Sequence, residues 1–175
     1  KEAFKQADFK IWLPRIGWVK CAENLRFTGK VNNVTVKRIA DMWFASINIE
    51  VPDSTPALKP TVGENQAIAG VDFGIKSMMV LSDGSTYDNP KALKKNLKRL
   101  KRLQRGLSRK QKGSKNRRKQ QVRVARLHYR ISCLRKTKIH QATADIVKKF
   151  DRIVIEDLNV DGMLKNRKIA QAIGD

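Results

Sequence analysis

The sequence has little of what stabilises secreted or membrane-spanning proteins. Two of its 175 residues are cysteines, Cys21 and Cys133, and they lie far apart with no metal-ligand spacing around them. This argues against a disulfide framework or a zinc site within the chain and favours a reducing, intracellular compartment. No apolar run approaches the ~18 residues of a membrane span, and residues 1–10 are too polar for a signal peptide. Because the first residue is Lys1, we expect the chain to begin inside a longer reading frame.

Acidic residues are also scarce. The chain has 16 Asp and Glu against 38 Lys and Arg, a formal net charge of +22. Self-repulsion on this scale opposes a compact state unless an anion neutralises it. Nucleic acid is the commonest large polyanion, and its phosphates attract Lys and Arg with release of counterions. The charge therefore favours a nucleic-acid partner over a membrane surface or a small-molecule substrate.

Composition divides the chain into two domains. Residues 8–51 alternate apolar and polar side chains in short runs, a pattern typical of an antiparallel sheet or a small barrel. The stretch that follows holds three of the five prolines, which indicates a linker. We therefore predict one domain over residues 1–52, a linker over residues 53–66 and a second domain over residues 67–175.

The second domain begins and ends with strand patterns. Apolar runs at residues 67–72 and 77–81, a turn at Asp83-Gly84 and a further run from Thr86 predict three antiparallel strands in a row. A short buried-type strand is predicted at residues 152–156.

Between these strands lies a basic segment with helical periodicity. Residues 91–130 contain no acid. Leucines recur at three- and four-residue intervals, the spacing of one helix face, and the pattern breaks at Gly113-Ser114 before a second stripe begins. The stripes comprise Leu93, Leu97, Leu100, Leu103 and Leu107, then Val124, Leu127, Ile131 and Leu134. We predict two helices joined as an antiparallel hairpin over residues 90–149.

The charge of this hairpin is unusual for a solvated surface. Solvated helices mix both signs because Glu–Lys pairs stabilise them, whereas like charges four residues apart are destabilising. A phosphate backbone beside the hairpin is the interpretation we favour over a merely solvated helix pair. Such contacts position a duplex without identifying its bases. The candidate phosphate-binding residues are Lys94, Lys98, Arg102, Arg105, Arg109, Lys112, Lys115, Arg117, Arg118, Lys119, Arg123 and Arg126.

Two acids follow apolar strand patterns. Asp72 ends the first strand of the second domain, and Glu156 ends the last. Burying a carboxylate is costly unless it pairs or binds a cation. Two acids at adjacent strand ends suit Mg²⁺, which prefers oxygen ligands, and such a site serves phosphodiester hydrolysis. Taken singly, Asp72 as a turn carboxylate and Glu156 as a cap remain alternatives.

Other polar and aromatic residues carry weaker signals. His128 and His140 have no acid or cysteine at ligand spacing and are interpreted as ordinary helix residues. Trp12, Trp18 and Trp43 fall in the strand region, where we expect core packing rather than base stacking.

Several of these segments resemble those of a known family. Residues 68–76 (IAGVDFGIK) are similar to the first RuvC motif of the transposon-encoded TnpB/OrfB proteins, which are relatives of the type V CRISPR effector nucleases. Residues 89–117 resemble the basic helical insert of that family, and residues 153–163 resemble its second RuvC motif. Residues 8–51 resemble the small wedge domain that precedes the nuclease.

The resemblance implies an α+β protein. A small antiparallel β-barrel of the wedge type would precede an incomplete RNase H-like (RuvC) domain with a long basic helical hairpin insert. The implied activity is that of a transposase or transposon-encoded endonuclease, with DNA and a guide RNA as partners, in the prokaryotic cytoplasm close to the nucleoid. Family members hold Mg²⁺ with three acids, of which Asp72 matches the first and Glu156 the second.

The chain departs from the family pattern in one respect that affects activity. The third acid and a four-cysteine zinc ribbon would follow Asp175, so we expect a partial chain that is inactive alone. A non-catalytic nucleic-acid-binding module is the main alternative. A ribosomal-type RNA-binding protein would explain the charge but not the two acid motifs.

Overall fold

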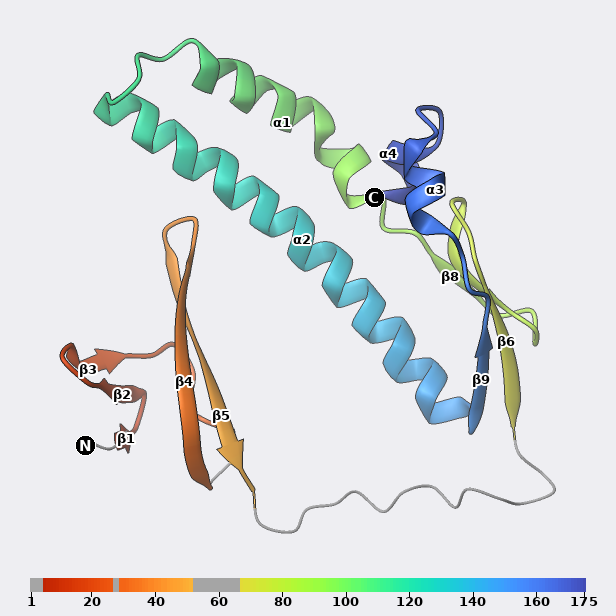
Figure 1. Ribbon diagram of the computed structural model, residues 1–175, viewed down its shortest axis with the longest axis horizontal. Coiled ribbons are helices and arrows are strands. Elements are labelled where there is room, and N and C mark those ends of the chain that lie inside the picture. Colours follow the sequence, from red (N-terminus) through yellow and green to blue (C-terminus); the bar gives the residue numbers. More distant parts are fainter. Residues whose placement is uncertain (1–4, 27–28, 52–66) are drawn as a thin grey trace. The chain divides into compact units, whose positions relative to one another are not determined.

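The computed structural model describes residues 5–26, 29–51 and 67–175 of the chain (Figure 1). The residues cluster into two compact units, Lys1–Arg38 with Met42–Ala57, and Ile39–Asp41 with Leu58–Asp175. The predicted linker, residues 53–66, lies outside the described residues. Among the described residues, no helix is both long and apolar enough to cross a membrane.

The first unit consists of strands in two sheets. Strands β1 (Lys5–Ala7), β2 (Lys10–Leu13) and β3 (Gly17–Lys20) form an antiparallel three-stranded sheet. Strands β4 (Lys30–Ile39) and β5 (Met42–Glu50) pair as a hairpin. The strand content agrees with the prediction, but the described strands do not close into a barrel. Closure requires continuous pairing around the circle, and here no pairing joins the two sheets among the described strands.

The second unit contains a mixed four-stranded sheet. It is formed by β6 (Ile68–Phe73), β7 (Ser77–Leu81), β8 (Thr86–Asp88) and β9 (Arg152–Ile155), in the order β8-β7-β6-β9. The first three are antiparallel neighbours, as the turn signals predicted, whereas β9 pairs with β6 in parallel. Parallel pairing needs a long crossover, and the helical hairpin between β8 and β9 provides it.

The hairpin consists of α1 (Ala92–Ser108) and α2 (Lys115–Lys149). The two helices pack through Ala92, Leu100, Leu127 and Ile131, with Leu93, Leu103 and Val124 partly buried against them. The Ser114 hydroxyl accepts the Arg117 N–H at 3.2 Å and caps α2, as expected of a serine at a helix start. The predicted stripe continues to Leu134, but that side chain is 42% exposed. It lies on the part of α2 beyond the start of α1, which is half as long.

The last turns of α2 pack on the sheet. Ala142 and Ile146 share a buried cluster with Ala69 and Val71 of β6 and with Met79 and Leu81 of β7. Polar contacts reinforce this packing, because the Tyr87 hydroxyl donates to the Asp145 carboxylate and Lys149 Nζ lies 2.8 Å from the same group. The two partners lower the pKa of Asp145, Lys149 more than Tyr87. One helix therefore belongs to both the hairpin core and the sheet core.

Two short helices follow β9. They are α3 (Val160–Lys165) and α4 (Ala170–Ile173). The Asp175 carboxylate beyond them accepts the backbone N–H groups of Leu93 and Lys94 at 2.6 and 2.8 Å. It thus caps α1, whose own N-cap residue Lys91 makes no side-chain cap bond.

We predict that Leu127→Ala destabilises the second unit by about 2–5 kcal/mol, because Leu127 is 4% exposed in the interhelical core. Leu134→Ala is the matched control on the same helix, and its 42% exposure predicts a change below about 1 kcal/mol. Urea unfolding followed by circular dichroism measures both. Equal losses in the two variants would contradict the observed pairing of α1 with α2.

Candidate functional site

The parallel pairing of β6 with β9 sets the positions of the two predicted acids. In this register Val71 lies opposite Ile155. The next residue along each strand is Asp72 on β6 and Glu156 directly after β9. Neighbouring strands lie ~4.8 Å apart. The two carboxylates are therefore carried side by side at the carboxyl ends of adjacent strands.

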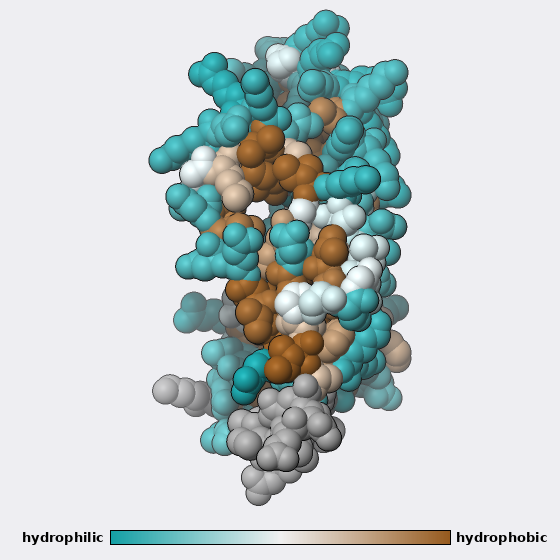
Figure 2. Space-filling view, turned by 90° about the vertical axis from the view of Figure 1, so that its right-hand side faces the viewer, coloured by the Kyte–Doolittle hydropathy of each residue, from teal (hydrophilic) through white to brown (hydrophobic). Residues whose placement is uncertain are grey.

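Both acids line one hollow of about 520 Å³. Ala69 and Val71 of β6 are buried toward α2, so the alternating residues Gly70 and Asp72 belong to the opposite face of the sheet. Figure 2 shows apolar residues gathered down the middle of the molecular face that carries β6 and β9, with polar residues around them. The lining consists of Gly70, Val71, Asp72, Val80, Leu81, Ser82, Val154, Ile155 and Glu156. It is mostly apolar, with the two carboxylates as its charged groups.

Two hydrogen bonds join Gly70 and Ser82, which both line this hollow. The Gly70 N–H donates to Ser82 Oγ at 3.0 Å, and the Ser82 N–H donates to the Gly70 carbonyl at 2.9 Å. These bonds join β6 to the end of β7 just before Asp72. Ser82 was not singled out from the sequence, because a serine after a strand has no distinguishing spacing.

Carboxylate oxygens are the ligands that Mg²⁺ prefers. Asp72 and Glu156 bring two such groups to one place. Within residues 5–26, 29–51 and 67–175, no cluster of three or more His, Cys, Asp or Glu side chains is positioned to hold an ion. His128 and His140 are exposed on α2.

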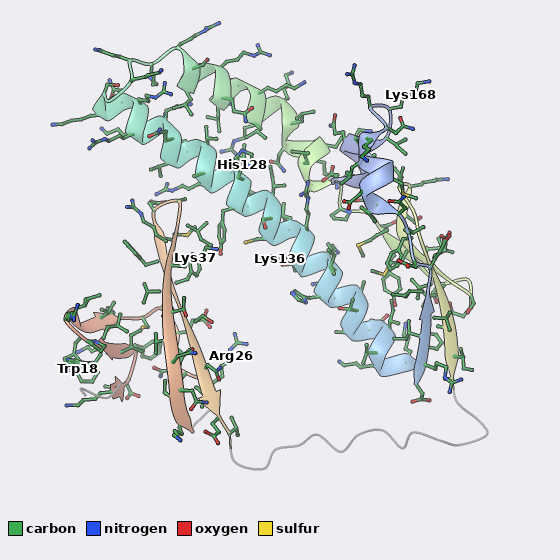
Figure 3. The ribbon with its side chains drawn as sticks, viewed as in Figure 1. Trp18, Arg26, Lys37, His128, Lys136 and Lys168 are labelled. Carbon is green, nitrogen blue, oxygen red and sulfur yellow. The ribbon has the colours of Figure 1, made fainter. Side chains whose placement is uncertain are left out.

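The basic candidates form a second feature, on the helical hairpin. Eleven of the twelve are exposed, and the twelfth, Arg117, is half-buried. Long side chains that end in nitrogen radiate from both helices and their turn (Figure 3). Arg126 forms an ion pair with Asp41, which raises the pKa of Arg126 through a hydrogen bond and charge attraction. Apart from Arg126, no candidate has an ion pair with a described residue, so most of this charge is unneutralised.

Arg117 differs from its neighbours. Its Nη1 donates to the carbonyls of Leu107 and Lys110 at 2.9 and 3.0 Å. These carbonyls belong to the end of α1 and the turn after it, where helix carbonyls lack intrahelical partners. Gln120 is buried and also joins the two helices, since its Nε2 donates to the carbonyl of Leu103 within α1 at 3.0 Å. The sequence did not predict either role, because Arg117 and Gln120 lie among other polar residues and nothing in their spacing distinguishes them.

The exposure of two tryptophans contradicts the expectation that the tryptophans pack in a core. Trp18 and Trp43 are 52% and 67% exposed, so core packing is wrong for these two residues. On β2, Ile11 and Leu13 occupy the buried face and Trp12 the other. Trp18 lies directly opposite Trp12 on β3 and shares that outer face.

We predict that the hairpin turn separates stability from nucleic-acid binding. Arg117→Gln should lower the free energy of unfolding by about 1–3 kcal/mol, because it removes hydrogen bonds from a charged donor to the carbonyls of Leu107 and Lys110. The double variant Arg118→Gln, Lys119→Gln should leave stability within about 0.5 kcal/mol, because both side chains are exposed.

The effect of the double variant on nucleic-acid binding is measured by titrating salt against its affinity for duplex DNA. If each exposed side chain contacts a phosphate, the double variant flattens the log–log slope by up to about 1.8. A slope that does not change would argue against phosphate contacts at the turn.

The chain matches a protein-family model. The family is OrfB_IS605, described as "Probable transposase", and the match covers residues 46–167. This range includes the four-stranded sheet, both hairpin helices and both acids.

Two similar proteins are named as putative RNA-guided DNA endonucleases. The chain is 38% identical over 92% of its length to "Putative RNA-guided DNA endonuclease InsQ" of Escherichia coli K12, and 43% identical over 81% to "Putative RNA-guided DNA endonuclease" of Streptomyces pristinaespiralis. It spans 39% and 34% of those relatives. Because the family model covers well over half of the chain, this protein belongs to the OrfB_IS605 transposase family.

Proposed function

We propose that this chain is the part of an RNA-guided, transposon-encoded DNA endonuclease that carries two metal-binding acids and a nucleic-acid-binding hairpin. The observation that carries the proposal is the β6–β9 register, which pairs Val71 with Ile155, the residues directly before Asp72 and Glu156. The strand order β8-β7-β6-β9, with β9 parallel to β6, agrees with an RNase H-like (RuvC) sheet. The names of the relatives in Escherichia coli and Streptomyces support the activity.

The donor set fits a divalent cation. Asp72 and Glu156 offer only carboxylate oxygens at the rim of a mostly apolar hollow, the chemistry that Mg²⁺ prefers over nitrogen or sulfur ligands. When bound, the ion would supply activation of water and stabilisation of the leaving oxygen in phosphodiester hydrolysis. The task of Asp72 and Glu156 is to hold it at the end of the sheet. A further acid would come from a segment outside the described residues.

The hairpin would hold the nucleic acid. Its exposed cations match a phosphate backbone, which favours recognition of a duplex by shape and leaves sequence to base pairing with a guide. Because α2 packs on the same sheet that carries both acids, the hairpin and the acid pair belong to one structural unit.

A non-catalytic nucleic-acid-binding module is the second candidate. The described residues bring together two acids rather than three, and this observation favours it. The basic hairpin serves this function equally well.

We predict that Asp72→Asn and Glu156→Gln each weaken Mn²⁺ binding, with Mn²⁺ as a paramagnetic substitute for Mg²⁺. Loss of one of two carboxylates should reduce affinity at least about tenfold, equivalent to ~1.4 kcal/mol. Asp88→Asn is the control, because Asp88 is an exposed acid at the end of β8, two strands away. Mn²⁺ titration followed by electron paramagnetic resonance measures the affinity of all three variants. If Asp72→Asn and Glu156→Gln bind Mn²⁺ as tightly as Asp88→Asn does, the proposed metal site is wrong.

Cleavage separates the two candidate functions. We predict that labelled target DNA, incubated with Mg²⁺, transposon-end RNA and the protein extended to the length of its relatives, is cut, and that Asp72→Ala abolishes cutting. In this proposal the longer protein would bring the further acid, and Asp72 would hold the ion. Binding of DNA and RNA without cutting by the extended protein would select the non-catalytic module.

A further inference from the structure

One face of the three-stranded sheet combines aromatic and basic side chains. Lys5 on β1 lies opposite Trp12 on β2, and Trp12 lies opposite Trp18 on β3. Directly opposed residues of antiparallel strands share a face, so these three form one row across the sheet. Two residues further along the same face, Lys10 lies opposite Lys20. We call the five residues the aromatic–lysine face.

This face is open. Lys5, Lys10 and Lys20 are exposed and Trp18 is 52% exposed, whereas Trp12 is half-buried. Figure 3 labels Trp18, which projects from the three-stranded sheet. The opposite face takes the apolar burial, since Ile11 and Leu13 are only 5% and 8% exposed. The tryptophans are therefore not needed to complete this sheet's buried side.

One lysine of this face already contacts a ring. Lys5 Nζ lies 5.7 Å from the centroid of the Trp12 ring, within the range of a cation–π interaction. Trp12 and Trp18 are an opposed pair, and the Cβ atoms of such a pair lie ~5 Å apart, so both indoles belong to one small area of the sheet.

We propose that the aromatic–lysine face binds unpaired nucleotides, with bases stacked on Trp18 and Trp12 and phosphates on Lys10 and Lys20. The proposal extends the proposed function, because it assumes a nucleic-acid partner and names the unpaired part of that partner as the ligand.

Charge and geometry select this ligand. None of the face's residues is acidic, and the three lysines beside the rings complement an anion. The lysine row is two residues from the tryptophan row, ~7 Å along the strands. A nucleotide has an aromatic base and an anionic phosphate at a separation of the same order. The face therefore matches both groups of one nucleotide.

An unpaired strand fits better than a duplex. Stacking on an aromatic side chain needs the flat face of a base, and a duplex covers that face with neighbouring base pairs. The hairpin cations recognise phosphates, which duplex and single strand share, so the aromatic–lysine face would supply preference for unpaired nucleotides.

The test compares two strands with equal charge. Fluorescence anisotropy measures binding of the 175-residue chain to a thymidylate oligonucleotide and to an abasic strand of the same length. Stacking is worth roughly fivefold to a hundredfold per base, so the thymidylate strand should bind more tightly by at least fivefold. Trp18→Leu should remove much of this gap, the difference in affinity between the thymidylate and abasic strands. Trp18→Phe should keep most of the gap because an aromatic ring remains.

Two controls sharpen the comparison. Ile16→Ala removes an apolar side chain that is 69% exposed in the β2–β3 turn, outside the face, and should leave the gap unchanged. The double variant Lys10→Gln, Lys20→Gln should weaken both strands alike and flatten the salt slope by up to about 1.4. Lys37→Gln, an exposed lysine on β4, is its single-site control.

The outcomes separate this inference from the proposed function. Equal binding of thymidylate and abasic strands, or a gap that survives Trp18→Leu, would overturn the stacking proposal while leaving the hairpin and acid-pair tests untouched. Tryptophan fluorescence that shifts with phosphatidylserine vesicles but not with the oligonucleotide would assign the face to membranes and overturn it too.

Discussion

The parallel pairing of β6 with β9 is the constraint on which the second unit depends. It joins strands that are far apart in the chain. The hairpin between β8 and β9 must therefore lead from one edge of the sheet to the other edge. The same pairing puts Asp72 beside Glu156. This one strand pairing therefore determines both where the helices lie and which two acids are neighbours. The hydrogen bonds between Gly70 and Ser82 fix β6 to the end of β7.

The hairpin shows how a chain tolerates many like charges. Its internal stability comes from apolar side chains along the α1–α2 contact and from polar side chains such as Arg117, which binds one carbonyl at the end of α1 and one in the turn after it. Most of the other cations project outward, where water and salt screen their repulsion. The two helices thus pack through their apolar sides, and most of their cations lie on the sides that face solvent.

Periodicity explains which features the sequence predicted. The leucine spacing located both helices, and the Asp83-Gly84 turn located the antiparallel strands, because both signals are local. Leu134 was misplaced in the interhelical core because the length of α1 limits which residues of α2 have a partner, and that is a tertiary property. Trp18 was misassigned for a similar reason, since which face of β3 is buried depends on its pairing with β2. Arg117 and Asp175 act on distant backbone groups, for which sequence spacing gives no signal.

The uninterrupted length of α2 has a mechanical consequence. With 35 residues it extends ~50 Å as a single rod. One end packs with α1 in the basic hairpin, and the other carries Ala142 and Ile146 into the core beneath β6 and β7. A force applied to the hairpin tip is therefore transmitted along the rod to the strand that holds Asp72.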